Sequence, residues 1–546
     1  MDMVTIVLVF LLAVVISVFV SKLLREKIPL PILQIALGTG LSTLGFDVEF
    51  DPHLFLLLFI PPLLFLDGWR IPKEALFHEM RPILSLAIGL VIVTVVGMGL
   101  FIHWLIPTIS LAIAFALAAI LSPTDPVSVS AMTVNSPLPS RIAHILEGES
   151  LLNDATGLVC FSFAVMATLT GTFSLSSATG EFFIVALGGG LVGLVVACGI
   201  GQLNQFLVKR TGEEPGIQIL ISLLIPFTAY LVAEHLHVSG ILAAVVAGIA
   251  MHYERLVGRM QSATRVQSKA VWDTIQIALN GMIFILLGEQ LPRLWHSLPQ
   301  VAESLGVSHV WELFGYVIII TLMLGALRFV WVWLAMSMTL FQRRNKDKSQ
   351  SRPRLHLRLI AVMAVSGVRG AITFAGILTL PLVMMDGSAF PHRDLAIFIS
   401  MGVILCSLLI ASMTLPFLTR GLTHNLPYDD EEIQARFALN EAAIIHLRNQ
   451  INHPGDDLDE MALRAEVGNY LLEIYERHLD NNGADNSGSD IQQFVKMEKQ
   501  LSRSALQAKR AKLVQLRKDR NISEQVYIHL RHELDLKEET LNHRKK

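Results

Sequence analysis

The sequence predicts an all-α polytopic membrane protein with a helical cytoplasmic tail, on three observations. The chain of 546 residues is 53% hydrophobic and only 16% charged, which is far more apolar than a soluble domain. Its apolar residues are gathered in long segments, and its basic residues fall in the connections after alternate segments. The composition then becomes strongly charged. We therefore expect a transmembrane domain over residues 1–421 and a cytoplasmic tail over 422–546.

Thirteen apolar segments are predicted to span the membrane, since a spanning helix needs about 20 apolar residues. They run over approximately 3–21, 29–45, 53–68, 83–105, 109–133, 142–172, 181–208, 215–235, 238–254, 271–291, 309–341, 357–383 and 394–420. The first segment lacks the basic region and the small-residue cleavage site of a signal peptide, so we expect it to be retained. An odd number of spans places the two ends of the chain on opposite sides.

The basic residues assign those sides. Twenty Lys and Arg residues lie in the connections after odd-numbered segments or, for Arg358, at the edge of the next segment, whereas only Arg293 and Arg393 follow even-numbered segments. Because cytoplasmic loops are enriched in Lys and Arg, the N-terminus is predicted to lie outside and the C-terminus in the cytoplasm.

The fifth segment is interrupted by Pro123, Thr124, Asp125 and Pro126. Each proline lacks an amide hydrogen and clashes with the preceding turn, so the backbone between them is predicted to be kinked or unwound. At membrane depth, unwound backbone is tolerated where it is buried in protein or lines a wet cavity, and its carbonyls could bind a cation. The alternative is a simple proline kink with Asp125 as a local helix cap.

The sixth segment contains a polar face made by Glu149, Ser150, Asn153 and Asp154. At 1.5 Å per residue, Asp154 lies roughly 18 Å into the helix, near the middle of the bilayer. Carboxylate, hydroxyl and amide oxygens suit a small cation that has shed part of its water. Burial also disfavours the charged carboxylate, so the same group can take a proton when the cation leaves. The alternative is a structural polar cluster that joins two helices.

Two arginines lie inside later apolar segments, and a buried arginine requires a carboxylate partner. Arg369 is favoured as the partner of Glu149 in a structural ion pair, which leaves Asp154 free to exchange ligands. Arg328 is a second candidate partner for Glu149 or for Asp125, and the sequence leaves this choice open.

Two features outside this site have open interpretations. Glu147 either lines an access funnel or is solvated at the start of its helix. The tail begins with an acidic run, Asp429 to Glu432, and is broken at 452–455 and 481–488 into stretches with helical spacing. It is either a solvated helical tail or a regulatory or dimer-stabilising module, because charge pattern alone does not separate the two.

Four runs of residues resemble the signatures of one family. They are Pro61-Pro62-Leu63-Leu64-Phe65 followed by Asp67-Gly68, Thr124-Asp125-Pro126, the run from Glu149 to Asp154, and Gly367-Val368-Arg369-Gly370-Ala371. Together they are similar to the cation/proton antiporter family that includes NhaP-type bacterial proteins and animal sodium/proton exchangers. The resemblance covers about residues 1–420 and does not extend to the tail.

This resemblance implies a NhaA-like fold of two inverted six-helix repeats, in which helices five and twelve cross where both are unwound. It also implies a homodimer in a bacterial cell (inner) membrane. By motif match, Asp154 exchanges cation and proton, whereas Thr124, Ser150 and Asn153 contribute ligands or order the site. The Na⁺ ligands would be Asp154, Ser150 and Thr124, and Asp125 would steady the crossing helices. The Asn-Asp pair is associated with electroneutral exchange of one cation for one proton.

The function expected from these observations is exchange of Na⁺ or Li⁺ for H⁺ by alternating access, contributing to pH and sodium homeostasis. A K⁺/H⁺ antiporter would share every motif, a channel would need a continuous pore, and a membrane ion sensor would signal through the tail. No catalytic triad, zinc spacing or phosphate loop stands out in the sequence. We therefore expect no enzyme activity, no cofactor and no nucleic-acid partner, with monovalent cations and protons as cargo.

Overall fold

The computed structural model describes residues 3–420 apart from 26–27, 46–51, 71–79, 134–137, 172–174, 252–261, 306–308, 347–356 and 385–386. Beyond residue 420 it describes only scattered residues between 441 and 537. The chain forms two compact units, Met1–His424 and Asn425–Lys546. Most of the second unit, including the acidic run and both breaks predicted in the tail, lies outside the described residues.

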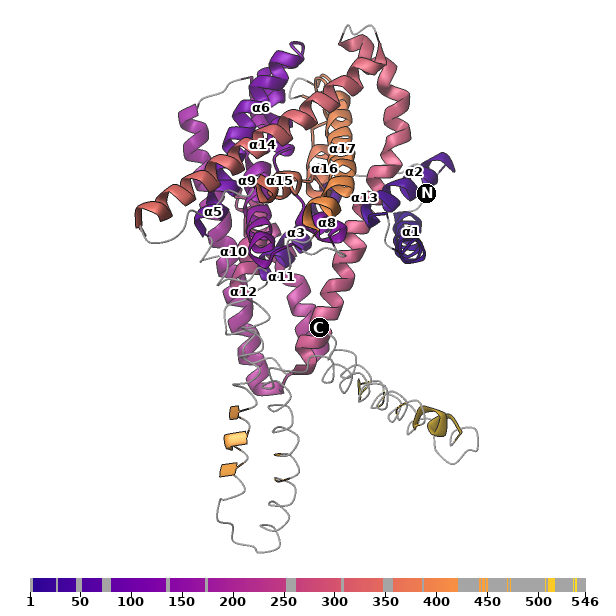
Figure 1. Cartoon of the computed structure of the whole chain (residues 1–546), viewed down its shortest axis with the longest axis vertical. Helices are drawn as coiled ribbons and strands as arrows, with labels where there is room; N and C mark the ends of the chain where they lie inside the picture. Colours follow the sequence, from indigo (N-terminus) through magenta and orange to yellow (C-terminus); the bar gives the residue numbers. More distant parts are fainter. Residues whose placement is uncertain are drawn as a thin grey trace, which may run out of the picture. The chain divides into compact units, whose positions relative to one another are not determined.

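The first unit is built of helices (Figure 1). Within its described ranges, the strand-like pairing is limited to one isolated bridge between Val383 and Ala389. The helices are α1 (Met3–Leu23), α2 (Leu30–Thr43), α3 (Pro52–Arg70), α5 (Met80–Leu84), the π-helix η1 (Ser85–Leu90), α6 (Val91–Leu105), α7 (Leu111–Ile120), α8 (Pro126–Met132), α9 (Ser140–Thr170), α10 (Leu175–Thr211), α11 (Pro215–His235), α12 (Gly240–Met251), α13 (Ser262–Ser304), α14 (Val310–Lys346), α15 (Leu357–Val365), α16 (Ala371–Leu378) and α17 (Arg393–Thr419).

Each predicted apolar segment overlaps one of these helices or an interrupted series of them. In the described part of the chain, eight helices are long and apolar enough to cross a membrane by themselves, and three apolar helices are shorter. The chain is therefore a multi-pass membrane protein. Helix α13 extends beyond its predicted range of 271–291 at both ends. Before the apolar stretch, good helix formers such as Gln267, Lys269 and Ala270 continue the helix.

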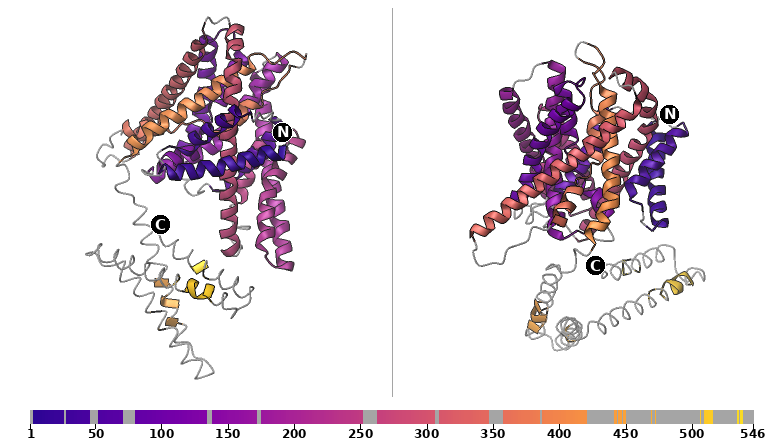
Figure 2. Two further views of the ribbon diagram at one scale, coloured as in Figure 1. Left: turned by 90° about the vertical axis from the view of Figure 1, so that its right-hand side faces the viewer. Right: turned by 45° about the horizontal axis from the view of Figure 1, so that its top comes forward.

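The helices pack as two bundles. The first bundle contains α1, α2, α3 and α10 to α13, in which α2 lies along α13 and α12 lies against both α3 and α10. Figure 2 shows α1 and α2 beside α13 in its right-hand view. The second bundle contains α5 to α9 and α14 to α17, in which α7 packs on α6 and α9, and α14 packs on α15 and α17. Contacts of α3 and α13 with α16, and of α3 with α9, join the bundles.

Aromatic packing holds α3 against α13 in the first bundle. The rings of Phe65 and Trp272 stack with their centroids 5.3 Å apart, and Trp69 meets Trp272 edge-on at 6.1 Å. Trp272 is fully buried, and its indole N–H donates a hydrogen bond to the hydroxyl of Ser222 on α11 at 3.2 Å. This arrangement satisfies both the apolar and the polar part of the indole, and it fixes the two helices that face the second bundle.

Two helical interruptions of the second bundle meet each other. Helix α7 ends at Ile120 and α8 begins at Pro126, while α15 ends at Val365 and α16 begins at Ala371. Between them, the backbone N–H of Asp125 donates to the carbonyl of Val368 at 2.8 Å. A Cβ atom at Gly370 would lie 2.2 Å from the Asp125 carboxylate, so this close approach requires glycine.

Candidate ion-binding site

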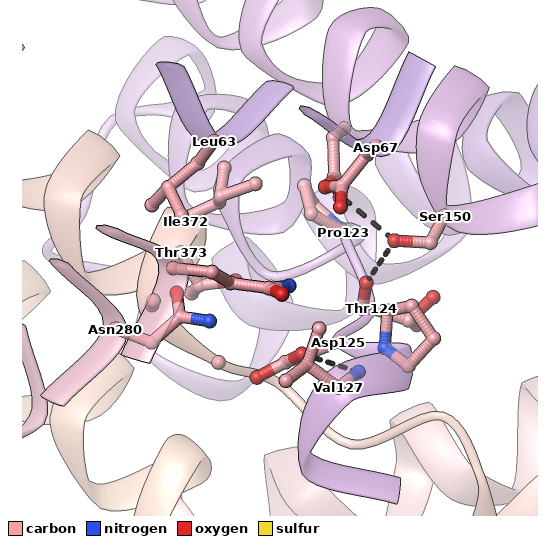
Figure 3. A pocket seen from close by; sticks show the side chains of 15 residues that line it. Leu63, Asp67, Pro123, Thr124, Asp125, Val127, Ser150, Asn280, Ile372 and Thr373 are labelled. Atoms are coloured by element: carbon pink, nitrogen blue, oxygen red, sulfur yellow. Dashed lines mark hydrogen bonds between the residues drawn. The ribbon is translucent and has the colours of Figure 1, made fainter. Parts of the chain in front are cut away.

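A pocket lies where the two interruptions face α3, α9 and α13 (Figure 3). Its cavity volume is about 30 Å³, which is enough for about two water-sized occupants. Its polar lining comes from both bundles and includes Asp67 and Asn280 from the first, and Thr124, Ser150 and Asp154 from the second. Residues from five separate parts of the sequence therefore converge on one small polar space.

Asp154 is a deeply buried carboxylate of this pocket with very little hydrogen bonding. Its side chain is 2% exposed, yet among the described residues its Oδ1 atom has no hydrogen-bond partner. Its Oδ2 atom accepts one long hydrogen bond, of 3.4 Å, from the hydroxyl of Ser150. The groups that act on it electrostatically include Asp67, Asp125 and Glu149, which are also acidic. A negative charge at Asp154 is therefore uncompensated unless a cation or a proton neutralises it.

Thr124 links the interrupted helix to α9. Its carbonyl accepts a hydrogen bond from the Ser150 hydroxyl at 2.7 Å, and its own hydroxyl accepts one from the Asn153 amide at 2.9 Å. In a continuous helix this carbonyl would bind the N–H of Ser128, but that N–H donates to Asp125 instead. The Thr124 carbonyl is thus bonded to Ser150, whose hydroxyl also donates to Asp154.

Asp125 caps the start of α8. Its Oδ1 atom accepts hydrogen bonds from the N–H groups of Val127 and Ser128 at 2.9 and 3.2 Å, and its Oδ2 atom accepts one from the Ser128 hydroxyl at 2.6 Å. Acidic residues stabilise this position because they satisfy unpaired N–H groups and face the positive end of the helix dipole. The local cap considered from the sequence is thus present, and the same residue also lines the pocket.

Glu149 forms its ion pair with Arg328. The sequence favoured Arg369 as the partner of Glu149, and that prediction was wrong. Both guanidinium NH groups of Arg328 donate to the Glu149 carboxylate, one of them at 2.8 Å, and its Nε atom donates to the carbonyl of Met363 at 3.0 Å. The three residues tie α9, α14 and α15 together. A Cβ atom at Gly367 would lie 2.5 Å from the Arg328 side chain, so the glycine makes room for this pair.

Arg369 instead satisfies backbone carbonyls that the interruptions leave free. Its Nε atom donates to the carbonyl of Leu121 at 2.9 Å, and its NH1 atom donates to that of Gly367. Its own backbone N–H donates to the Ser407 hydroxyl at 3.2 Å. A guanidinium has five N–H donors and can serve such carbonyls as well as a carboxylate. The sequence could not separate the two arginines because this choice depends on where the unwound carbonyls lie.

Two pocket residues, Asp67 and Asn280, have no role in the site predicted from the sequence. Asp67 belongs to a run that resembles a family signature, but no ligand role was predicted for it. Asn280 is a lone polar residue inside an apolar segment, which is a weaker signal than a motif. At the end of α3, the Arg70 guanidinium donates to Asp273 and Gln276 of α13. Glu147 is exposed on α9 and is not part of the pocket wall. Within the described ranges, no three His, Cys, Asp or Glu side chains group as a site for a metal ion.

Comparisons with known proteins agree on one family. The model of the family described as "Sodium/hydrogen exchanger, transmembrane" matches residues 7–421. The chain is 40% identical to the uncharacterized Na(+)/H(+) exchanger YjcE of Escherichia coli, over 98% of both chains. It is 37% identical to a sodium, potassium, lithium and rubidium/H(+) antiporter of Bacillus pumilus, over 96% of this chain and 77% of that one.

The fold resembles a solved structure as well. It matches the sodium proton antiporter MjNhaP1 of Methanocaldococcus jannaschii with a TM-score of 0.56 and 18% sequence identity, over 78% of this chain and 100% of that chain.

Proposed function

This chain belongs to the sodium/hydrogen exchanger family, and on that premise we propose that it exchanges Na⁺ or Li⁺ for H⁺ across a membrane at Asp154. Members of the family are transporters, and the antiporter motifs of this chain surround the pocket described above. The single observation that carries the proposal is the Oδ1 atom of Asp154, which is buried in that pocket and has no hydrogen-bond partner in the described part of the chain. Either a cation or a proton can neutralise such a carboxylate, and in this proposal these are the two ions that the protein transports.

The neighbours of Asp154 supply the other ligands in this proposal. The hydroxyl of Ser150 and the carbonyl of Thr124 lie one hydrogen bond apart, and both oxygens can also face a cation. Asn153 holds Thr124 in place through its amide. Asp125 steadies the interrupted helices by capping α8, and Asp67 brings a second carboxylate from the other bundle. Carboxylate, hydroxyl and carbonyl oxygens are hard ligands, which suit alkali cations.

The mechanism we propose is alternating access. The second bundle, which carries Asp154, moves against the first when a cation or a proton has neutralised the site. The empty, charged form resists this movement, because an uncompensated charge is expensive in an apolar surrounding. This penalty couples the two fluxes, and with one exchanging carboxylate it gives electroneutral exchange of one cation for one proton. The pair of Glu149 and Arg328 stays neutral throughout and serves as a fixed strut.

The wider architecture is proposed from the same family. It comprises thirteen spans with the N-terminus outside, inverted repeats whose unwound helices cross, a homodimer and a bacterial inner membrane. The tail is proposed to be regulatory. The name of the Bacillus pumilus relative includes potassium and rubidium, so transport of these ions should be tested as well. Exchange of K⁺ alone and ion sensing without transport have less support.

The test uses the purified full chain in proteoliposomes with an imposed pH gradient, a trapped pH dye and a clamped potential. Addition of Na⁺ or Li⁺ should collapse the gradient with the wild type and leave it intact with Asp154→Asn, which keeps the size of the side chain but removes its charge. The response to K⁺ and Rb⁺ then gives the cation range. If no cation collapses the gradient, or if the variant matches the wild type, the proposed site is wrong.

A further inference from the structure

A buried hydroxyl in the pocket remains unexplained by the proposed function. The side chain of Thr373 on α16 is 1% exposed and lines the pocket. Its Oγ1 atom has no hydrogen-bond partner among the described residues. Buried polar groups nearly always have a partner, so an orphaned one calls for a reason.

The position of Thr373 in its helix explains why the hydroxyl is free. Buried threonines inside continuous helices can donate to the carbonyl four residues earlier, as Thr321 does to Val317 and Thr419 does to Leu415. Helix α16 begins only at Ala371, so the residue four positions before Thr373 lies in the unwound stretch. Thr373 thus has no helical carbonyl to use, and the interruption itself makes its oxygen available to a ligand.

Asn280 brings a second neutral polar group, a side-chain amide, to the same space. It lies on α13, in the first bundle, and its half-buried side chain lines the pocket. In the view of Figure 3, Asn280 and Thr373 are drawn on the side opposite to Ser150 and Thr124. In this arrangement, a cation beside Asp154 would have Ser150 and Thr124 on one side and the polar groups of Thr373 and Asn280 on the other.

We propose that the Thr373 hydroxyl and the Asn280 amide oxygen are cation ligands that set the choice among alkali cations, an inference that rests on the proposed antiport. Small cations such as Li⁺ and Na⁺ hold their water tightly, so they need a complete set of protein oxygens to replace it. K⁺ and Rb⁺ release water more easily and tolerate a missing ligand. Removal of either neutral oxygen should then disfavour the small ions more than the large ones.

The test measures KM and maximal rate for Li⁺, Na⁺, K⁺ and Rb⁺ in the same proteoliposomes. For an ion that is not transported, the constant for its inhibition of Na⁺ transport is measured instead. Thr373→Val keeps the shape of the side chain and removes its hydroxyl. It should raise KM for Li⁺ and Na⁺ roughly tenfold, as the loss of one buried hydrogen-bonding oxygen would. KM for K⁺ and Rb⁺ should change much less. Thr373→Ser, which restores the hydroxyl, should restore the order of the four ions.

The chain offers a matched control in Ser400 of α17. Its hydroxyl is also fully buried and unpartnered within the described residues, but it does not line the pocket. Ser400→Ala should therefore leave the ratios of the KM values unchanged. Asn280→Leu repeats the test from the other bundle, should Thr373→Val fail to fold.

Three results would count against the inference. Unchanged KM ratios in the Thr373→Val and Asn280→Leu variants overturn it, while the antiport proposal stands if wild type still exchanges and Asp154→Asn does not. An equal change of the ratios in Ser400→Ala also overturns it, because a general packing effect would then account for the data. Absence of cation exchange in the wild type overturns both proposals.

Discussion

Glu149 and Asp154 lie five residues apart on α9 and are equally buried, at 1% and 2% exposure, but their surroundings are opposite. Glu149 is neutralised by Arg328, which contacts both of its oxygens. Asp154 has no basic partner among its hydrogen bonds, and one of its oxygens has no hydrogen bond within the described residues. The comparison teaches that burial alone does not mark an exchanging carboxylate. An exchanging carboxylate is one that is buried at the wall of a pocket and has no basic residue to neutralise its charge.

The largest effect should follow from breaking the compensated pair. Arg328→Met leaves the Glu149 charge buried without a partner, which is expected to lower the free energy of unfolding by about 3–5 kcal/mol. Thermal unfolding of the purified protein in detergent measures this loss. Glu149→Gln combined with Arg328→Met removes both charges and should recover most of the stability.

The variant with both Glu149→Gln and Arg328→Met also tests whether the pair has only a structural role. If Glu149 and Arg328 are only a strut, the double variant should still exchange cations, whereas each single variant should be impaired through folding. A double variant that folds but has lost exchange would contradict the structural role of the pair.

A smaller effect is expected at Asp67, the carboxylate that faces the pocket from α3. Asp67→Asn removes one negative charge from the pocket wall and should raise KM for Na⁺ by roughly threefold to tenfold, because a cleft of one charge sign concentrates the opposite ion. The maximal rate should change little, since Asp154 is retained. Asp67→Glu, which restores the charge, serves as the control. A complete loss of exchange in Asp67→Asn would instead make Asp67 an exchanging group.

The smallest effect concerns the cap of α8. Asp125→Asn keeps an oxygen that can accept from Val127 and Ser128, whereas Asp125→Ala removes it. The alanine variant should therefore be less stable than the asparagine variant by about 1 kcal/mol, the usual worth of a helix cap. Equal stabilities of the two variants in thermal unfolding would show that capping is not the role of Asp125 in stability.

The sequence predicted most of the helical segments and several of the residues that line the pocket, for a physical reason. Apolar segments of about 20 residues have few alternatives to a spanning helix, and the prolines at 123 and 126 cannot continue one. The polar run on α9 shares one helical face, so Ser150 and Asp154 could be grouped without a structure.

The remainder of the site depends on tertiary contacts, which a local sequence pattern does not define. The choice of Arg328 over Arg369 follows from the positions of the carbonyls of Leu121 and Gly367 in space. Asp67 and Asn280 reach the pocket because α3 and α13 pack against the interrupted helices, which periodicity along one segment does not reveal. For Asn280, a single polar residue in an apolar segment is too weak a signal by itself.

Competition at one carboxylate also predicts a pH dependence with a definite sign. Protonation of Asp154 removes the cation site, so KM for Na⁺ should rise as the pH falls. In the range where the site is mostly protonated, the rise should approach about tenfold per pH unit, because one proton is displaced by each cation. Initial rates of exchange at several pH values measure it, and a KM that does not depend on pH would contradict competition.

The most direct test of the central claim is the number of protons released when Na⁺ binds the purified protein, measured by calorimetry in two buffers of different ionisation enthalpy. Near the acidic end of the range in which Na⁺ still binds, we expect about one proton per cation for the wild type. The variant with both Glu149→Gln and Arg328→Met should release the same number, and Asp154→Asn should release none. Proton release that persists in Asp154→Asn, or that disappears in the double variant while Na⁺ still binds, would contradict the assignment of Asp154 as the exchanging carboxylate.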